Sequence, residues 1–230
     1  MISDSQNAFV GGRQILDAVL VANASVDSRL RQRNEGSICK LDFEQADDNV
    51  KWEFLLYVME MMGFGVTWRL WIHFCISMVR MSILGKGSPA RFFPTHRGLR
   101  QGDPLSLMLF LLVMEALGHL LSRAVHGGLL QGFEVGSRST SLVVSHLFYV
   151  DDALIFCNAG ADQIGHLRCV LWCFEAVSGL WVNLLKSKLI PIGEVTRLQV
   201  FAAILGCKVA SLLILYLGLP LELLSRPEGC

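Results

Sequence analysis

The chain has 230 residues, of which 53% are apolar and 17% are charged, and its formal net charge is zero. It is long enough to bury a large core in one domain or in two packed subdomains. Zero net charge argues against a general attraction of the whole chain to nucleic acid, so the distribution of charge is more informative than its sum.

Charge is uneven along the chain. No acidic residue occurs between Glu60 and Asp103. Basic residues fall in that interval and acidic residues lie just upstream of it: Arg69, Arg80, Lys86, Arg91, Arg97 and Arg100, and Asp42, Glu44, Asp47, Asp48 and Glu53. A cationic surface beside carboxylates suits a polyanion whose reacting phosphate is bound through metal. The alternative is ordinary scatter of charge over exposed faces.

Seven cysteines, an odd number, include no Cys-x-x-Cys pair and lie mostly in apolar runs. This pattern argues against zinc and against a disulfide framework, and it predicts buried, reduced thiols in an intracellular protein, without distinguishing nucleus from cytoplasm. The N-terminus lacks the basic and apolar regions of a signal peptide. Residues 105–121 approach membrane-spanning length, but polar and small residues interrupt them, so we expect a buried core helix and no membrane association.

Taken in chain order, the apolar periodicity predicts helices over residues 12–31, 50–62, 66–81, 103–122, 164–177 and 195–205. Strands are predicted over 37–43, within 178–188 and over 212–221, with hairpins or loops over 85–94, 130–144 and 145–157. In the first helix the predicted apolar face comprises Ile15, Leu16, Val19, Leu20 and Val26. Interleaved helices, strands and hairpins indicate an α+β (mixed) fold.

Residues 97–106, RGLRQGDPLS, combine a helix start with a glycine-rich loop. Asp103 before Pro104 is a typical N-cap followed by proline at the first helical position. Glycines free the loop of side chains and three neighbours supply hydrogen-bond donors: Gly98 and Gly102, and Arg97, Arg100 and Gln101. The loop could therefore approach a phosphate or a base closely, or it could be a capped helix entry that binds nothing.

Two adjacent carboxylates, Asp151 and Asp152, separate the apolar runs 147–150 and 153–156. This pattern predicts a β-hairpin with buried arms, although Asp-Asp is an unusual turn because glycine normally supplies the positive φ. A divalent cation would offset the repulsion between two neighbouring carboxylates. A solvated Asp-Asp turn is the alternative.

The motifs occur in a fixed order: residues 6–15 (QNAFVGGRQI), 41–46 (LDFEQA) with Asp48, 97–106, 149–152 (YVDD), 178–183 (SGLWVN) with Lys186 and Ser187, and 216–220 (YLGLP). Together they resemble the reverse transcriptase domain of plant non-LTR (LINE-type) retrotransposons. The resemblance implies a right-hand polymerase palm with partial fingers and no thumb. Residues 1–36 would be partial fingers, and residues 37–230 mostly palm with some finger elements.

The same resemblance implies an RNA-directed DNA polymerase that adds dNTPs to a DNA primer on an RNA template. Two Mg²⁺ or Mn²⁺ ions would be bound by Asp42, Asp151 and Asp152, and Lys186 would assist the leaving pyrophosphate. Nucleic acid or nucleotide would be contacted by Arg13, Phe43, Asp47, Arg97, Gly98, Arg100, Gln101, Gly102, Tyr149, Tyr216 and Gly218. Thumb, endonuclease and finger segments of a longer retroelement protein would be missing.

Asp47 departs from the pattern of the family. The family has at this position an aromatic residue, which packs under the sugar and excludes a 2′-hydroxyl. An aspartate removes that wall and adds negative charge near an incoming triphosphate, so we expect little or no polymerase activity. The alternative function is therefore a degenerate retroelement relic without catalysis, with at most residual nucleic-acid binding.

Overall fold

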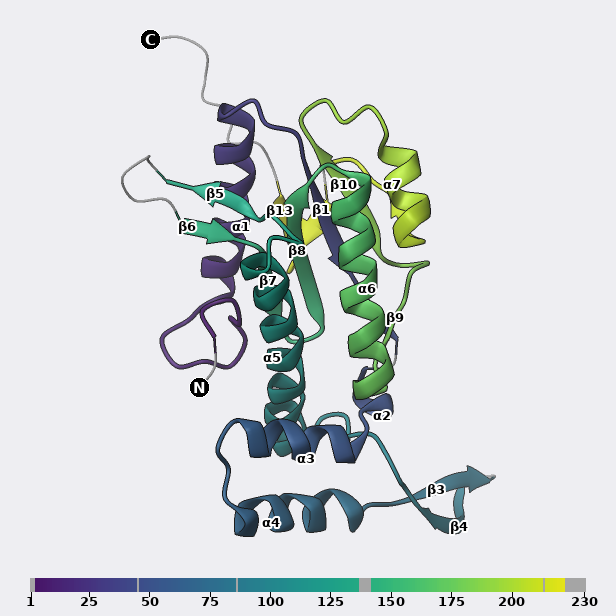
Figure 1. The fold of residues 1–230 in the computed structure, drawn as a ribbon. Coiled ribbons are helices and arrows are strands. Elements are labelled where there is room, and N and C mark those ends of the chain that lie inside the picture. The colour runs from purple at the N-terminus through teal and green to yellow at the C-terminus, as the bar shows by residue number, and fades with distance from the viewer. Residues whose placement is uncertain (1–2, 45, 86, 137–141, 213, 222–230) are drawn as a thin grey trace.

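The computed structural model describes residues 3–44, 46–85, 87–136, 142–212 and 214–221. Its centre is a five-stranded sheet in the order β11-β10-β1-β8-β7 (Figure 1). Its strands are β1 (Gly36–Leu41), β7 (His146–Tyr149), β8 (Asp152–Asn158), β10 (Lys188–Ile192) and β11 (Lys208–Val209). The central strand β1 is antiparallel to both β8 and β10, whereas β10 and β11 are parallel.

Both faces of this sheet are buried, each against its own helices. Ile38 and Phe156 face a core shared with α1 (Ile15–Arg31). Cys39 and Ile155, one residue away along their strands, face the larger core formed with α5 (Pro104–His126) and α6 (Ala161–Ser178). Successive strand residues point to opposite faces, so the continuous apolar runs of β1 and β8 fill both cores.

Helix α1 buries a different face from the one predicted. Val19 and Val26 are buried as expected, but Ile15, Leu16 and Leu20 are exposed. The buried residues follow a stripe of mostly small side chains: Ala18, Val19, Ala22, Ser25, Val26 and Arg29. Small residues allow the helix to approach the sheet closely. This close packing selects the buried face, although larger apolar side chains lie on the exposed face.

The predicted core helix is α5. Asp103 accepts a hydrogen bond from the backbone N–H of Leu105 (3.1 Å), so the predicted N-cap is confirmed. By length and composition α5 is the one helix among the described residues that could cross a membrane. In its most apolar stretch 56% of residues are buried inside the structure, and Phe110 and Met114 lie in the larger core. This is the environment of a helix at the centre of a folded domain.

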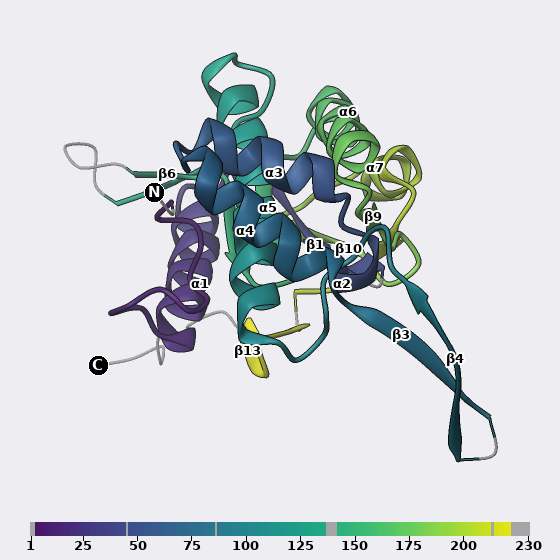
Figure 2. The same ribbon diagram turned by 90° about the horizontal axis from the view of Figure 1, so that it is seen from below.

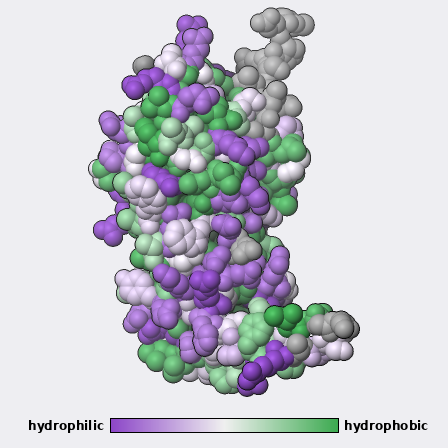
Figure 3. All heavy atoms as spheres, turned by 90° about the vertical axis from the view of Figure 1, so that its right-hand side faces the viewer, coloured by the Kyte–Doolittle hydropathy of each residue, from purple (hydrophilic) through white to green (hydrophobic). Residues whose placement is uncertain are grey.

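A separate group of elements extends from one end of the sheet (Figures 1 and 2). It begins with α2 (Ala46–Asn49) and α3 (Trp52–Met61), continues through α4 (Val66–Ser77), and ends in the hairpin of β3 (Arg80–Gly85) and β4 (Ser88–Pro94). We call α4 with the β3–β4 hairpin the arm. Its large apolar side chains are mostly exposed: Trp68, Leu70, Trp71, Phe74, Ile83, Leu84 and Phe92. Figure 3 shows hydrophobic side chains on the surface of this hairpin.

The remaining elements are a set of short strand pairs and one helix. They are β2 (Phe43–Glu44) with β9 (Trp181–Val182), β5 (Phe133–Val135) with β6 (Leu142–Val144), and α7 (Leu198–Leu205). The predicted single strand at 212–221 is instead a hairpin of β12 (Ile214–Tyr216) and β13 (Leu219–Leu221). Leu217 and Gly218 both have positive φ, the backbone of a tight two-residue hairpin turn.

Only some of the cysteines are buried. Cys39 and Cys157 are buried, but the prediction of buried thiols is wrong for three others, since Cys75, Cys169 and Cys173 are exposed. Their spacing within apolar runs did not reveal which helix face each occupies. Cys230 lies outside the described residues.

Candidate active site

Three aspartates lie at the same end of the sheet. The register pairs Leu41 with Ala153, so Asp42, which follows β1, lies beside Asp152 at the start of β8. Tyr149 pairs with Asp152, which leaves Val150 and Asp151 as the two-residue turn between β7 and β8. The structure thus brings together the acids that the sequence singled out, although more than a hundred residues separate Asp42 from the other two.

The carboxylates repel one another and are balanced by two lysines. Burial raises the pKa of Asp152, and the charges of Asp151 and Asp42 raise it further against the opposing charge of Lys40. Lys40 Nζ lies 3.5 Å from Asp152 Oδ1. Lys186 Nζ lies 3.9 Å from Asp42 Oδ2, so the predicted active-site lysine reaches the first aspartate. The site therefore holds concentrated negative charge with cations at its edge.

Lys40 was not singled out by sequence reasoning. Besides its ion pair with Asp152, its Nζ donates a hydrogen bond to the carbonyl of Leu215 (3.0 Å), which links the β12–β13 hairpin to the acids. The sequence did place Lys40 on the same face of the strand as Asp42, because the two residues are two positions apart. Its partners, however, come from distant parts of the chain.

The backbone of Asp42 is held by the segment between β9 and β10. Asn183 N–H donates to the carbonyl of Asp42 (2.7 Å), and Asp42 N–H donates to Ser187 Oγ (3.1 Å). Ser187 Oγ also donates to the carbonyl of Asn183 (2.8 Å), which closes the segment on itself. The SGLWVN and Lys186–Ser187 motif thus fixes the position of Asp42.

The turn that carries Asp151 is strained. Val150, a β-branched residue, has a φ of 55°, in the left-handed region that such side chains rarely adopt. A conformation of this kind costs on the order of 1–3 kcal/mol and persists where its surroundings enforce it. Here the two arms of the hairpin are buried on both sides of the turn, so packing holds Asp151 in place.

The RGLRQGD loop packs against α2 through its backbone. Leu99 N–H donates to the carbonyl of Asp47 (2.6 Å), and Gly98 N–H donates to that of Val50 (2.8 Å). A Cβ on Gly98, whose φ is +85°, would lie 2.6 Å from the carbonyl oxygen of Asp48. The close approach that the sequence predicted at Gly98 is therefore made by the chain itself. Gly102, with φ +82°, faces open space.

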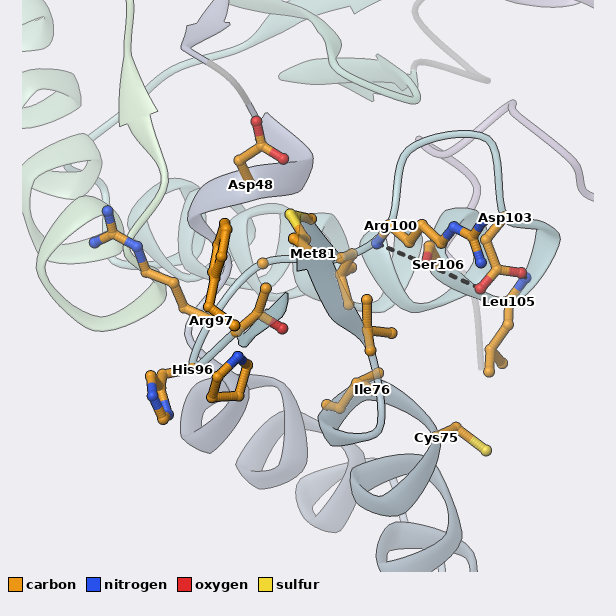
Figure 4. Close-up of a pocket in the computed structure, with 16 residues that line it drawn as sticks. Asp48, Cys75, Ile76, Met81, His96, Arg97, Arg100, Asp103, Leu105 and Ser106 are labelled. Carbon is orange, nitrogen blue, oxygen red and sulfur yellow. Dashed lines mark hydrogen bonds between the residues drawn. The ribbon is translucent and has the colours of Figure 1, made fainter. Parts of the chain in front are cut away.

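Two cavities lie on either side of this contact. A cavity of about 520 Å³ beside the acids is lined by Phe43, Asp47, Gln101, Val150 and Asp151, with Ala46, Asp48, Leu107 and Phe110. A second, of about 350 Å³, lies between the loop and the arm and includes Arg97 and Arg100 (Figure 4). Figure 4 shows these two arginines at opposite ends of that cavity. Of the three predicted donors, Gln101 is the one that lines the cavity of the acids.

Asp47 faces the cavity of the acids. Burial raises the pKa of its carboxyl, and the nearby charges of Asp151 and Asp48 raise it further. The residue that departs from the family pattern thus stands close to Asp151, one of the three predicted metal ligands.

Two predicted contact residues turn inward. Arg13 Nη1 donates to the carbonyls of Ser3 (2.6 Å) and Gln6, and Nη2 pairs with Asp4 (2.8 Å). The guanidinium thus organises its own segment, whose Asn7 N–H donates to the carbonyl of Phe148 on β7 (3.0 Å). The contact of Arg13 with a template stays a prediction.

Tyr216 is the second such residue, because its side chain is fully buried in the α1-side core. The ring presents no exposed surface in this structure, and its contact with a primer stays a prediction. Burial also raises the pKa of its hydroxyl. Gly218, at the exposed turn of the same hairpin, remains accessible. Tyr149 is half-buried next to the acids.

The donor set fits a hard divalent cation, because all three side chains offer carboxylate oxygens. Within the described residues, however, no three potential ligands are gathered closely enough to enclose a metal ion. The ion pairs of Lys40 and Lys186 engage two of the carboxylates instead. The acids share one end of the sheet without forming a closed ligand cluster.

The profile of the family described as reverse transcriptase (RNA-dependent DNA polymerase) matches residues 1–221. An uncharacterized mitochondrial protein of Arabidopsis thaliana is 38% identical over 91 residues, which are 40% of this chain and 65% of that protein. Among solved structures, apo telomerase of Candida tropicalis, truncated from its C-terminal domain, has a TM-score of 0.58 at 12% identity. Telomerase of Candida albicans, in complex with a fragment of telomeric RNA, has a TM-score of 0.56 at 14% identity.

These matches differ in what they cover. The telomerase alignments take in 81% and 76% of this chain but only 36% and 30% of those chains, and at such low identity they show the fold alone, a polymerase palm. The family profile spans nearly the whole chain, so it shows the family as well as the fold. Members of this family use divalent metal ions and bind a nucleic-acid template. The chain belongs to the reverse transcriptase family, the RNA-directed DNA polymerases.

Proposed function

We propose that the chain is the palm, with partial fingers at residues 1–36, of a polymerase from a plant non-LTR (LINE-type) retrotransposon. It would act inside the cell, as part of a longer retroelement protein, and extend a DNA primer with dNTPs on an RNA template. The proposal is carried by one observation, the position of Asp42, Asp151 and Asp152 at the same end of β1 and β8. The family motifs in their expected order support it further.

We further propose that these three aspartates hold two Mg²⁺ or Mn²⁺ ions. When bound, the ions supply the positive charge that lowers the pKa of the primer 3′-hydroxyl and offsets charge on the leaving pyrophosphate. The chain contributes positioning, since β1, β8 and the strained turn fix the carboxylates before substrate arrives. Lys186, whose ammonium is exposed beside Asp42, is suited to meet the pyrophosphate as it leaves.

Asp47 supports a second candidate function, a relic that binds nucleic acid without catalysis. Its half-buried carboxylate lines the cavity of Asp151 and adds negative charge where a triphosphate would enter. Like charges at this distance weaken binding of the anionic substrate and of its transition state. We therefore expect the unmodified chain to be a slow polymerase at best.

Primer extension tests both functions. The chain and its Asp47→Tyr, Asp151→Asn and doubly substituted variants are given an RNA template, an annealed DNA primer, four dNTPs and either Mg²⁺ or Mn²⁺. We expect weak extension by the unmodified chain and at least about tenfold faster extension by Asp47→Tyr, about 1.4 kcal/mol in the barrier. Asp151→Asn should abolish extension in both backgrounds.

Other outcomes decide between the candidates. Rapid dNTP incorporation by the unmodified chain would show that Asp47 is harmless. Extension that survives Asp151→Asn would refute the assignment of the acids. If Asp47→Tyr is inactive but still binds the template–primer duplex in a fluorescence anisotropy titration, the relic function is the correct one.

A further inference from the structure

The N-terminal segment lies along the outer edge of β7 as an extra strand. Phe148 N–H donates to the carbonyl of Ser5 (2.8 Å), and Asn7 N–H donates to the carbonyl of Phe148 (3.0 Å). Gln6 forms a parallel bridge with Phe148 between these two bonds. Because β7 ends the sheet, the two bonds satisfy backbone groups that β8 does not reach. We call residues 3–8 the strap.

A buried carboxylate fastens the strap to α5. Glu115 is 1% exposed and lies in the middle of this apolar helix. Its Oε2 accepts a hydrogen bond from Ser3 N–H (3.0 Å), and its Oε1 accepts one from Ser3 Oγ (3.0 Å). Within the described residues Glu115 makes no ion pair, so both of its oxygens depend on Ser3. Detaching the strap would leave a desolvated carboxylate without donors, which costs free energy.

Hydroxyl groups continue this contact to the first residue of β7. Ser3 Oγ and Ser5 Oγ lie 2.8 Å apart, and Ser5 Oγ lies 2.9 Å from Nε2 of His146. Burial and the charge of His119 lower the pKa of His146 to about 4, so its ring is neutral near pH 7. Because the carboxylate of Glu115 only accepts, every donor in this series points toward it, beginning with Nε2–H of His146.

The strap bonds to β7 close to the strained turn that carries Asp151. Phe148 lies two residues before Val150, whose φ of 55° persists only where the surroundings enforce it. On one side of the turn, β8 is bonded to both β1 and β7. On the other side, β7 is bonded to β8 and, at its outer edge, to the strap. Loss of the strap would therefore free one arm of the hairpin, and the turn would relax.

We propose that Glu115 is a positioning residue, which acts through the strap to hold the turn where Asp151 can bind a metal ion jointly with Asp42. This inference rests on the proposed metal site, and it gives residues 3–8 a role that requires no contact with nucleic acid. Glu115 touches neither metal nor substrate, so its effect passes through hydrogen bonds alone. It also explains why a helix apolar enough to cross a membrane carries a buried acid at its centre.

The affinity for Mn²⁺ is the first measurement, since it needs no nucleotide and no turnover. Free Mn²⁺ gives a sharp electron paramagnetic resonance signal that broadens on binding, so a titration of the 230-residue chain yields a dissociation constant. Glu115→Leu removes both anchors of Ser3 and keeps the core apolar. We expect it to weaken Mn²⁺ binding at least about tenfold, as for other groups that orient metal ligands. Ser3→Ala and Glu115→Gln, which each retain one of the two bonds, should lose less.

Hydrogen–deuterium exchange of the metal-free chain is the second measurement. In Glu115→Leu the backbone amides of the strap and of residues 146–151 should exchange faster, whereas those of β1 should not change. Ile192→Ala is the matched control, because it truncates a buried side chain at the end of β10 opposite the acids. It should lower the urea midpoint and leave the Mn²⁺ affinity unchanged.

Asp151→Asn separates this inference from the proposed function. If Asp151→Asn loses Mn²⁺ binding but Glu115→Leu binds as tightly as the unmodified chain, the positioning role is wrong and the metal site stands. The same conclusion follows if Ile192→Ala weakens binding as much as Glu115→Leu, because the effect is then a general loss of stability. If the unmodified chain binds no Mn²⁺, or Asp151→Asn binds it equally well, the proposed metal site fails together with this inference.

Discussion

The five-stranded sheet and the arm are built from similarly apolar sequence but bury it to very different extents. In the sheet, β8 runs between two cores and Phe156 is 1% exposed. In the arm, Phe92 on β4 is 61% exposed, and α4 buries only Ile72 and Ile76. Packing on both faces fixes the register that aligns the aspartates, whereas the arm is ordered mainly by its own backbone hydrogen bonds.

The largest predicted effect tests this difference with one matched pair of truncations. Phe156→Ala should lower the free energy of unfolding by about 3–5 kcal/mol, since it removes a ring enclosed by core side chains. Phe92→Ala should change it by no more than about 0.5 kcal/mol, because the ring is already in solvent. Urea denaturation followed by circular dichroism measures both. Similar losses in the two variants would mean that the arm is packed as tightly as the sheet.

The contrast also separates what the sequence could predict from what it could not. The hairpin of Asp151 and the strand before Asp42 follow from local apolar runs and turn patterns, and the ordered motifs identify which acids belong together. The lysine that pairs with Asp152 and the burial of Tyr216 depend on which strands become neighbours. That information lies in tertiary packing, so single-residue patterns do not carry it.

Gly98 illustrates the same limit. Its position in the RGLRQGD loop predicted an approach by a ligand, but its missing side chain makes room for the carbonyl of Asp48. Glycine signals that something comes close without saying what. Only the positions of α2 and the loop identify the neighbour.

The loop that joins the arm to α5 gives the second prediction, again as a matched pair. Gly98→Ala combines left-handed strain of about 1–2 kcal/mol with a backbone collision of about 1–3 kcal/mol, so we expect a total loss of about 2–5 kcal/mol. Gly102→Ala has the same positive φ but meets no atom within 4 Å, so only the strain of about 1–2 kcal/mol remains. Thermal unfolding of the two variants compares them directly. Equal destabilisation would mean that α2 can move away from the loop.

The smallest effect concerns the acid end of the sheet. Burial, together with Asp151 and Asp48, raises the pKa of Asp47 above its ordinary value. Between the unfolded and folded pKa values the folded chain binds more protons than the unfolded chain, so stability falls as pH rises through that window. Above the folded pKa the loss is complete. Ionised Asp47 therefore destabilises the metal-free fold at pH 7.

Asp47→Asn should accordingly be more stable than the unmodified chain at pH 7 in metal-free buffer. The difference should shrink as pH falls and vanish below about 3.9, where aspartate is protonated in both states. Glu194→Gln, which removes an exposed carboxylate from a loop, should show no comparable gain. Urea midpoints measured from about pH 3.5 to about pH 7 provide the test, because this range includes the ordinary aspartate pKa of about 3.9. A stability difference between the two chains that widens on acidification would mean that the fold stabilises the Asp47 anion. The cavity beside Asp151 would then be a cationic environment rather than the anionic one that its lining residues indicate.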